Sequence, residues 1–171
     1  MALKKERAFS HVEHGFPAFV EADSEVLILG SFPSVKSREQ AFFYGHPQNR
    51  FWPMMSAIFG EEAGQSIEEK KRFLKRHHLA LYDVIESCDI VGSSDASIRN
   101  VVPADIQSLI EGTKIKPILL NGKKAGSLFE KHLLPLLGGS ITYRIMPSTS
   151  PANAATKFIE LVSEYKDALN R

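Results

Sequence analysis

Residues 42–52 concentrate side chains that could bind a flat polar ligand. The stretch reads Phe-Phe-Tyr-Gly-His-Pro-Gln-Asn-Arg-Phe-Trp, so phenol, imidazole, amide and guanidinium groups stand among aromatic rings. A surface loop does not need this density of such groups, whereas ligand pockets combine apolar walls with a few placed polar groups. We therefore treat Tyr44, His46 and Asn49 as candidate ligand-binding residues. For Trp52 we favour packing in the core of a following helix.

Two further segments, residues 30–34 and 147–153, bring hydroxyl groups and prolines together, and the second precedes a predicted helix. Helix N-termini and free backbone N–H groups bind phosphate readily. Each segment by itself could be an ordinary turn, and only their combination with residues 42–52 indicates a site. The candidates are Gly30, Ser31, Phe32, Pro33 and Ser34 in the first segment and Pro147, Ser148, Thr149, Ser150, Pro151 and Asn153 in the second.

Four short apolar runs would position these segments. They are Val26–Gly30, Leu79–Asp83, Pro117–Asn121 and Ile141–Met146, and each ends in a polar or turn residue, as expected for strands buried on both faces. Helical patterns separate them, and this alternation predicts a single α/β domain over residues 1–171 with a mainly parallel sheet. The predicted helices cover approximately residues 50–59, 67–77, 104–111, 123–134 and 154–169.

Ligands of open α/β sheets bind beyond the carboxyl ends of the strands, so the residues that close each strand matter most. Asp83 ends the second predicted strand and Asn121 the third. Asp83 could orient water or simply cap the residues after it, and Asn121 could belong to a plain turn. Lys123 and Lys124 begin the next helix and could contact phosphate, although paired surface lysines are common. The segments that follow the strands are residues 31–48, 84–100, 121–124 and 147–153.

Composition limits the classes of partner and cofactor. Lys and Arg number 21 against 20 for Asp and Glu, so any contact with nucleic acid must come from local patches of charge. The single cysteine, Cys88, excludes an internal disulfide and is typical of a protein of the reducing cytoplasm. Neither His46 nor the pair His77 and His78 has a second ligand cluster at metal-binding spacing, so we predict no metal. No run approaches the roughly 20 apolar residues of a membrane span.

Taken in order, residues 30–34, 46–52 and 147–153 resemble the motifs of the uracil-DNA glycosylase superfamily. The similarity is greatest to its hypoxanthine-DNA glycosylase branch and runs from about Val26 to the final helix. The resemblance implies a short, mainly parallel four-stranded sheet flanked by helices on both faces. It also implies a DNA glycosylase that needs no cofactor and acts on DNA containing a deaminated base, with hypoxanthine preferred and uracil as the alternative. Because no lysine is clearly placed to attack the sugar, we predict a monofunctional enzyme, and we expect it to be a monomer.

The chain departs from its relatives at two positions. Ser31 and Phe32 stand where other branches carry the asparagine or aspartate that holds the hydrolytic water. The hypoxanthine branch assigns this role to the asparagine that matches Asn49. An amide is too weakly basic to remove a proton at neutral pH, so we expect Asn49 to position water and stabilise charge.

Further roles follow from the resemblance. Phe51 is expected to stack on the flipped base, an interaction worth roughly 1–3 kcal/mol, although core packing is an open alternative. Asp83 stands where classical members read the pairing edge of uracil, and it could accept the N1–H of hypoxanthine or orient the water instead. The segment 147–153 is expected to enter the DNA, with Lys123 and Lys124 near its phosphates.

Two other functions compete with this interpretation. A doubly wound sheet with phosphate-binding loops also suits a non-catalytic nucleotide-binding module, which would need no water-holding residue. A serine hydrolase could use Ser31 or Ser34 with His46 as the base. The absence of a Gly-x-Ser-x-Gly elbow argues against the hydrolase.

Overall fold

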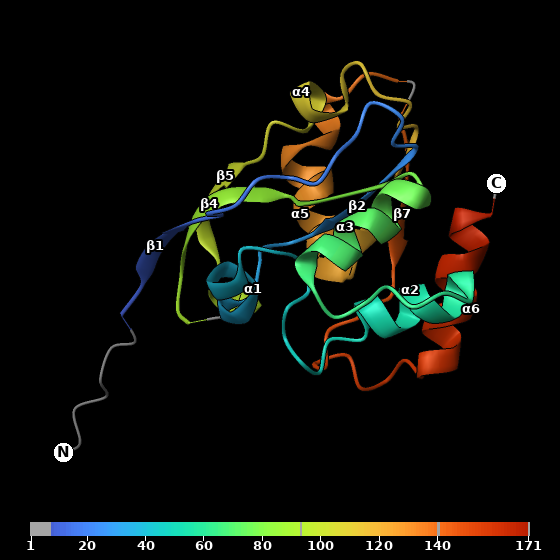
Figure 1. Ribbon diagram of the computed structural model, residues 1–171. Helices are drawn as coiled ribbons and strands as arrows, with labels where there is room; N and C mark the ends of the chain where they lie inside the picture. Colours follow the sequence, from blue (N-terminus) through green and yellow to red (C-terminus); the bar gives the residue numbers. More distant parts are fainter. Residues whose placement is uncertain (1–7, 93, 140, 171) are drawn as a thin grey trace.

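The four predicted strands form one parallel sheet. The computed structural model describes residues 8–92, 94–139 and 141–170, so residues 1–7, 93, 140 and 171 of the predicted domain lie outside the described residues. The strands are β2 (Val26–Gly30), β3 (Leu79–Asp83), β6 (Pro117–Asn121) and β7 (Thr142–Met146), in the order β3-β2-β6-β7 (Figure 1). The first three have the predicted bounds, and the fourth begins one residue later than predicted.

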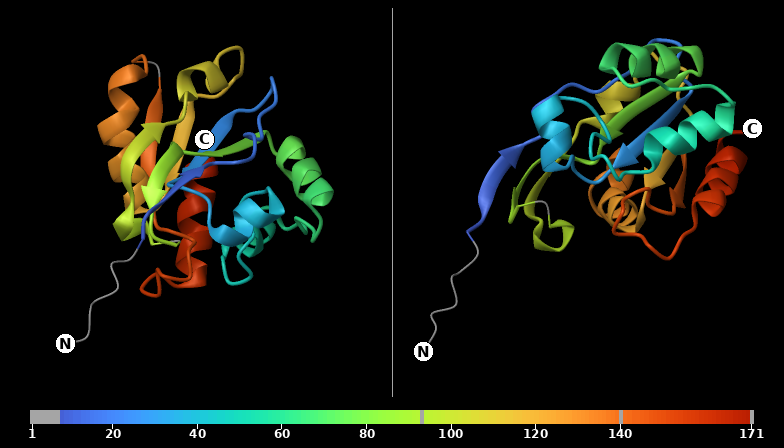
Figure 2. Two further views of the ribbon diagram at one scale, coloured as in Figure 1. Left: turned by 90° about the vertical axis from the view of Figure 1, so that its left-hand side faces the viewer. Right: turned by 60° about the horizontal axis from the view of Figure 1, so that its bottom comes forward.

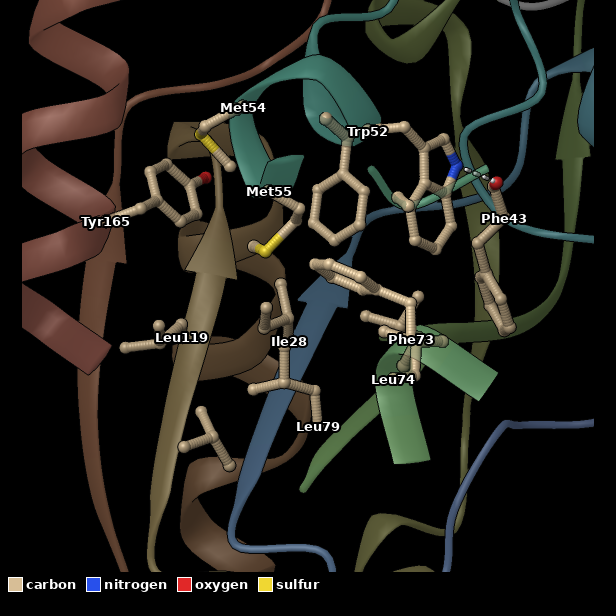
Figure 3. Packing of buried hydrophobic residues seen from close by; sticks show 14 of the residues in the cluster. Ile28, Phe43, Trp52, Met54, Met55, Phe73, Leu74, Leu79, Leu119 and Tyr165 are labelled. Carbon is tan, nitrogen blue, oxygen red and sulfur yellow. Dashed lines mark hydrogen bonds between the residues drawn. The ribbon is translucent and has the colours of Figure 1, made fainter. Parts of the chain in front are cut away.

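The sheet is covered on both faces, which explains why β2 is apolar throughout and buried at all five positions. Helices α2 (Phe51–Phe59), α3 (Ile67–Arg76) and α6 (Phe158–Leu169) cover one face. Figure 3 shows this layer, in which side chains of α2 and α3 pack on Ile28 of the central strand. The core position predicted for Trp52 is confirmed, and its indole N–H donates to the Phe43 carbonyl at 3.1 Å.

The opposite face packs on α4 (Ile106–Ile110), α5 (Lys123–His132) and a second, antiparallel sheet. This sheet has the order β1-β4-β5 and consists of β1 (Ser10–Glu13), β4 (Ile85–Ile90) and β5 (Arg99–Pro103) (Figure 2).

The sequence predicted no strand within residues 84–100, and the structure places β4 and the start of β5 there. Ile85, Cys88 and Ile90 of β4 are buried against the second face of the main sheet, so this segment contributes a strand to the core before it reaches the cavity.

Two helix predictions also need correction. Helix α1 (Val35–Gln40) lies within residues 31–48, where no helix was predicted, and Ser34 caps it by accepting the Ser37 N–H. The last helix begins at Phe158 rather than at residue 154. Residues 151–156 form turns instead, because the Arg50 guanidinium donates to the carbonyls of Asn153 and Thr156 at 2.8 and 2.7 Å.

Short 3₁₀ turns at Asp95–Ser97 and Leu134–Leu136 complete the described elements. Within the described part of the chain, none of the helices has the length and apolar character needed to cross a bilayer.

Candidate active site

The carboxyl ends of β2, β3 and β6 open into a cavity of about 300 Å³. This is the small end of the range for ligand pockets and suits a single ring system. Most of the predicted residues meet here, although they come from five separate segments. The predicted residues that line the cavity are Gly30, Ser31, Phe32, Pro33, Ser34, Tyr44, His46, Asn49, Asp83, Asn121, Lys124, Ser148, Thr149, Ser150 and Pro151.

Asp83 provides a buried carboxyl group at the end of β3. Only 5% of the residue is exposed, and a Cβ at position 30 would collide with its Oδ1 atom, so glycine at Gly30 allows the carboxyl to lie against the neighbouring strand. The other oxygen, Oδ2, lies 2.7 Å from Nε2 of His14, which is 1% exposed. Asp83 therefore has one oxygen paired in the interior and one beside Gly30.

The His14–Asp83 pair shares a single proton between its two facing atoms. The Nδ1 atom of His14 lies 2.9 Å from the Phe16 carbonyl oxygen, which can only accept, so Nδ1 carries a hydrogen. The contact between Nε2 and Oδ2 then holds one further proton, as imidazolium with carboxylate or as imidazole with carboxylic acid. Both forms have zero net charge, and both leave Oδ1 of Asp83 as a hydrogen-bond acceptor.

Nothing in the sequence motifs points to His14, because it is 69 residues away from Asp83 along the chain. It follows β1, an element that was itself not predicted. The rings of Phe16 and Tyr82 lie 4.4 Å from its imidazole ring, so the pair is enclosed by aromatic side chains. An enclosed pair of this kind is costly to break, because the remaining partner stays away from water.

Asn49 lies at the start of α2 and uses its side-chain oxygen within the protein. Oδ1 accepts the backbone N–H of Phe51 at 3.0 Å and the hydroxyl of Thr149 at 2.9 Å. These two bonds occupy both lone pairs of the oxygen. What Asn49 can offer the cavity is consequently its NH₂ group.

Thr149 links Asn49 to Asn121 at the end of β6. It is fully buried, its backbone N–H donates to Asn121 Oδ1 at 3.0 Å, and its hydroxyl accepts from Asn121 Nδ2 at 3.0 Å. Its carbonyl accepts the backbone N–H of Arg50 at 3.0 Å. The loop after β7 is thus bound both to the neighbouring strand and to the start of α2.

Tyr44, rather than Phe51, presents an aromatic ring to the cavity. The two rings stack at 4.0 Å with an angle of 22° between them, and Phe51 is fully buried. The predicted stacking of Phe51 on a ligand was therefore wrong, because Tyr44 covers that ring and lines the cavity in its place. The structure shows the alternative, core packing.

The Tyr44 hydroxyl is buried and lacks a hydrogen-bond partner among the described residues. Burial raises the pKa of the Tyr44 phenol far above its usual range, the Asp83 carboxyl adds to this shift, and the nearby Asn121 amide opposes it. The phenol accordingly stays protonated at neutral pH. It is a free donor close to the acceptor of Asp83.

The hydroxyl and imidazole groups do not form a nucleophile–base pair. Ser34 donates its hydroxyl to Ser37 at 3.1 Å, and Nδ1 of His46 accepts the backbone N–H of Gln48 at 3.1 Å. These hydrogen bonds of Ser34 and His46 therefore give no support to the alternative of a serine hydrolase. In the neutral imidazole, the free Nε2 of His46 would carry the hydrogen.

Charged groups lie at the mouth of the cavity. Lys124 lines it together with Asp95, a residue that was not predicted. Partial desolvation raises the pKa of Asp95, and the positive charge of Lys124 opposes this shift. Gly122, with φ of 104°, allows the turn before Lys124 to approach Ser148, where an added Cβ would come within 3.0 Å of the serine side chain.

Besides Phe51, three predicted residues lie outside the cavity lining. Lys123 is exposed on the first turn of α5. The Pro147 carbonyl accepts the Tyr165 hydroxyl at 2.9 Å, and the Asn153 amide donates to the Ser148 carbonyl at 2.9 Å. The last two thus brace the loop after β7. Over residues 8–92, 94–139 and 141–170, no group of three or more His, Cys, Asp or Glu side chains is placed to hold a metal ion.

The chain is similar in sequence to known DNA glycosylases. Residues 17–171 match the Uracil DNA glycosylase superfamily. A protein named "Hypoxanthine DNA glycosylase" from Methanosarcina acetivorans is 37% identical over 145 residues, which cover 83% of this chain and 89% of the relative. A protein of the same name from Methanosarcina barkeri is 34% identical over 144 residues, covering 82% and 88%.

A solved structure agrees with these sequence matches. It is a solution NMR structure from Methanosarcina acetivorans of a protein named as a candidate uracil DNA glycosylase. It superimposes with a TM-score of 0.77 at 33% identity, and the match covers 91% of this chain and 94% of that one.

Proposed function

Since this chain belongs to the uracil DNA glycosylase superfamily, we propose that its substrate is DNA with a deaminated base and that hypoxanthine is the preferred base. The protein is a DNA glycosylase, an enzyme that hydrolyses the bond between a base and its deoxyribose. Both curated relatives described above are named as hypoxanthine DNA glycosylases. Enzymes of this kind take the target base out of the helix before they act on it.

The observation that carries the proposal is the set of hydrogen-bonding groups in one cavity. Asp83 offers an acceptor, while Tyr44 and Asn49 offer a hydroxyl and an NH₂ donor. Hypoxanthine presents the complementary groups, with a donor at N1–H and acceptors at O6, N3 and N7. Uracil also presents a donor at N3–H between two carbonyl oxygens, so it remains the second candidate. The Tyr44 ring, in place of Phe51, provides the aromatic face for the base.

Cleavage of the N-glycosidic bond develops positive charge on the sugar and negative charge on the departing base. Donors that face the base stabilise that negative charge. Water adds its oxygen to C1′ of the deoxyribose, the bonding electrons leave with the base, and the proton of the water is passed to the base or the solvent. We assign Asn49 to hold this water by donating its NH₂ group to the water oxygen, and Asp83 to accept the N1–H of the base.

Contacts with the DNA backbone are proposed for the cavity mouth. Lys124 and the serine hydroxyls of Ser148 and Ser150 line it, and Lys123 is exposed beside it on α5. Lysine and hydroxyl contacts of this kind position a protein on the phosphates without reading sequence. We further propose that the enzyme acts as a monomer in the reducing cytoplasm, since one chain supplies every group used here and its sole cysteine, Cys88, is buried.

A panel of duplexes tests this proposal. Each duplex carries one hypoxanthine, uracil, xanthine or undamaged base, and alkali cleaves any abasic site after incubation with the protein. We expect the largest release from hypoxanthine, an intact strand before alkali, and no adduct trapped by borohydride. A folded Asn49→Ala protein, prepared in parallel, controls for contaminating glycosylases. Failure to release any base from the panel would contradict the proposal, and a trapped adduct would contradict the monofunctional mechanism.

A further inference from the structure

We infer that Thr149 and Asn121 are positioning residues, which hold the Asn49 amide so that its NH₂ group, and not its carbonyl oxygen, faces the reacting atoms. This inference rests on the proposed function and deepens it. The three side chains come from the loop after β7, the end of β6 and the start of α2, and form one continuous chain of hydrogen bonds.

Two backbone N–H groups fix every proton in this chain of bonds. The N–H of Phe51 can only donate, so the Asn49 atom 3.0 Å from it must be the oxygen. The N–H of Thr149 likewise identifies the Asn121 atom 3.0 Å away as the oxygen. An amide whose orientation depends on side chains alone could be flipped. Here both orientations are determined by the main chain.

The direction of the central hydroxyl bond follows from the second amide. Because its oxygen is bound to the Thr149 N–H, Asn121 must present its NH₂ group to the Thr149 hydroxyl, at 3.0 Å. The hydroxyl accepts there, and its own proton is directed to the Asn49 oxygen at 2.9 Å. Thr149 is fully buried, so water does not easily replace any of these bonds.

The consequence for catalysis is that Asn49 acts as a donor. With both lone pairs of its oxygen occupied, it cannot accept a proton from water, but it can hold the water oxygen or the leaving base through N–H. Loss of the Thr149 hydroxyl would leave only the Phe51 N–H to oppose rotation of the amide. A rotated amide would present an acceptor where a donor is needed.

Single-turnover base release from a hypoxanthine duplex tests the inference, with the enzyme titrated to saturation. Thr149→Val removes the hydroxyl with little change in volume, and we expect the saturated rate to fall about tenfold, the fold-change that corresponds to one hydrogen bond. The half-saturating enzyme concentration should stay within twofold of the wild-type value. Thr149→Ser keeps the hydroxyl and should restore the rate to within about threefold of the wild type.

Two further variants separate positioning from a general loss of structure. Thr113→Val is a matched control, because it removes a hydroxyl that donates to the Ile110 carbonyl at the opposite end of the sheet, and its rate should equal that of the wild type. Asn121→Asp leaves an oxygen for the Thr149 N–H but removes the NH₂ donor. The Thr149 proton would then turn to the carboxylate, and we expect the same tenfold loss.

The decisive measurement is the double variant with Asn49→Ala. If Thr149 acts through Asn49, adding Thr149→Val to Asn49→Ala should change the rate less than twofold, since the two effects are not additive. A full further tenfold loss, or a Thr149→Val protein with the wild-type rate, would overturn the inference. A wild-type protein that releases none of the altered bases would instead refute the proposed function.

Discussion

Replacing Asn49 with aspartate distinguishes a donor from a water-activating base at this position. The aspartate can keep the two bonds that the amide oxygen now makes, to the Phe51 N–H at 3.0 Å and the Thr149 hydroxyl at 2.9 Å. Its second oxygen then replaces the NH₂ group in the cavity. Removal of one preorganised donor typically lowers the rate roughly 100- to 1,000-fold, or about 2.7–4 kcal/mol. We expect a loss of at least ~100-fold for both Asn49→Ala and Asn49→Asp.

Single-turnover rates on hypoxanthine and uracil duplexes are the assay, together with the affinity for uncleaved damaged duplex, which should change little for Asn49→Ala. Asn170→Asp makes the same change of charge on an exposed residue at the end of α6 and should keep the wild-type rate. If an acceptor is needed instead, Asn49→Asp should be clearly faster than Asn49→Ala. That order, or near-normal base release by a folded Asn49→Ala protein, would refute the reasoning.

Three other predictions concern stability, DNA contact and metal. His14→Leu leaves the buried Asp83 carboxyl without its partner and should lower the free energy of unfolding by about 3–5 kcal/mol in urea titrations; a loss below about 1 kcal/mol would speak against a tightly paired carboxyl. The logarithm of the duplex affinity should fall linearly with the logarithm of salt concentration, and Lys124→Ala should reduce the magnitude of that slope by about 1; an unchanged slope would exclude a phosphate contact by this lysine. EDTA should leave base release unchanged, whereas activity lost on chelation and regained with added metal would contradict the prediction that the enzyme needs no metal.

The main sheet was predictable because its signals are local. Each of β2, β3 and β6 is a five-residue apolar run that ends in glycine, aspartate or asparagine, and the parallel arrangement places those three ends at one edge. The antiparallel sheet was missed because β5 is mostly exposed. Its strand β4 follows β3 after a single residue, so no turn signal separates the two.

The identity of the aromatic ring that lines the cavity could not be predicted from residue type alone. Tyr44 and Phe51 are both aromatic, and the resemblance favoured Phe51 for the ligand. The structure places Tyr44 over Phe51, with Tyr44 in the left-handed backbone region at φ of 55°. Which ring covers the other depends on how the loop returns across the sheet, and the sequence does not encode this locally.

By itself the sequence determined which segments would meet, since hydrophobic periodicity reports burial and parallel strands end at one edge of their sheet. Only the tertiary structure decided which polar atoms pair there. His14 meets Asp83 across 69 residues and Thr149 meets Asn49 across 100. A hydrogen bond forms only when donor and acceptor come within about 3 Å in the right direction. Spacing along the chain does not give the distance and direction between a donor and an acceptor. The contact of Asp83 with His14 and the orientation of the Asn49 amide depend on that geometry.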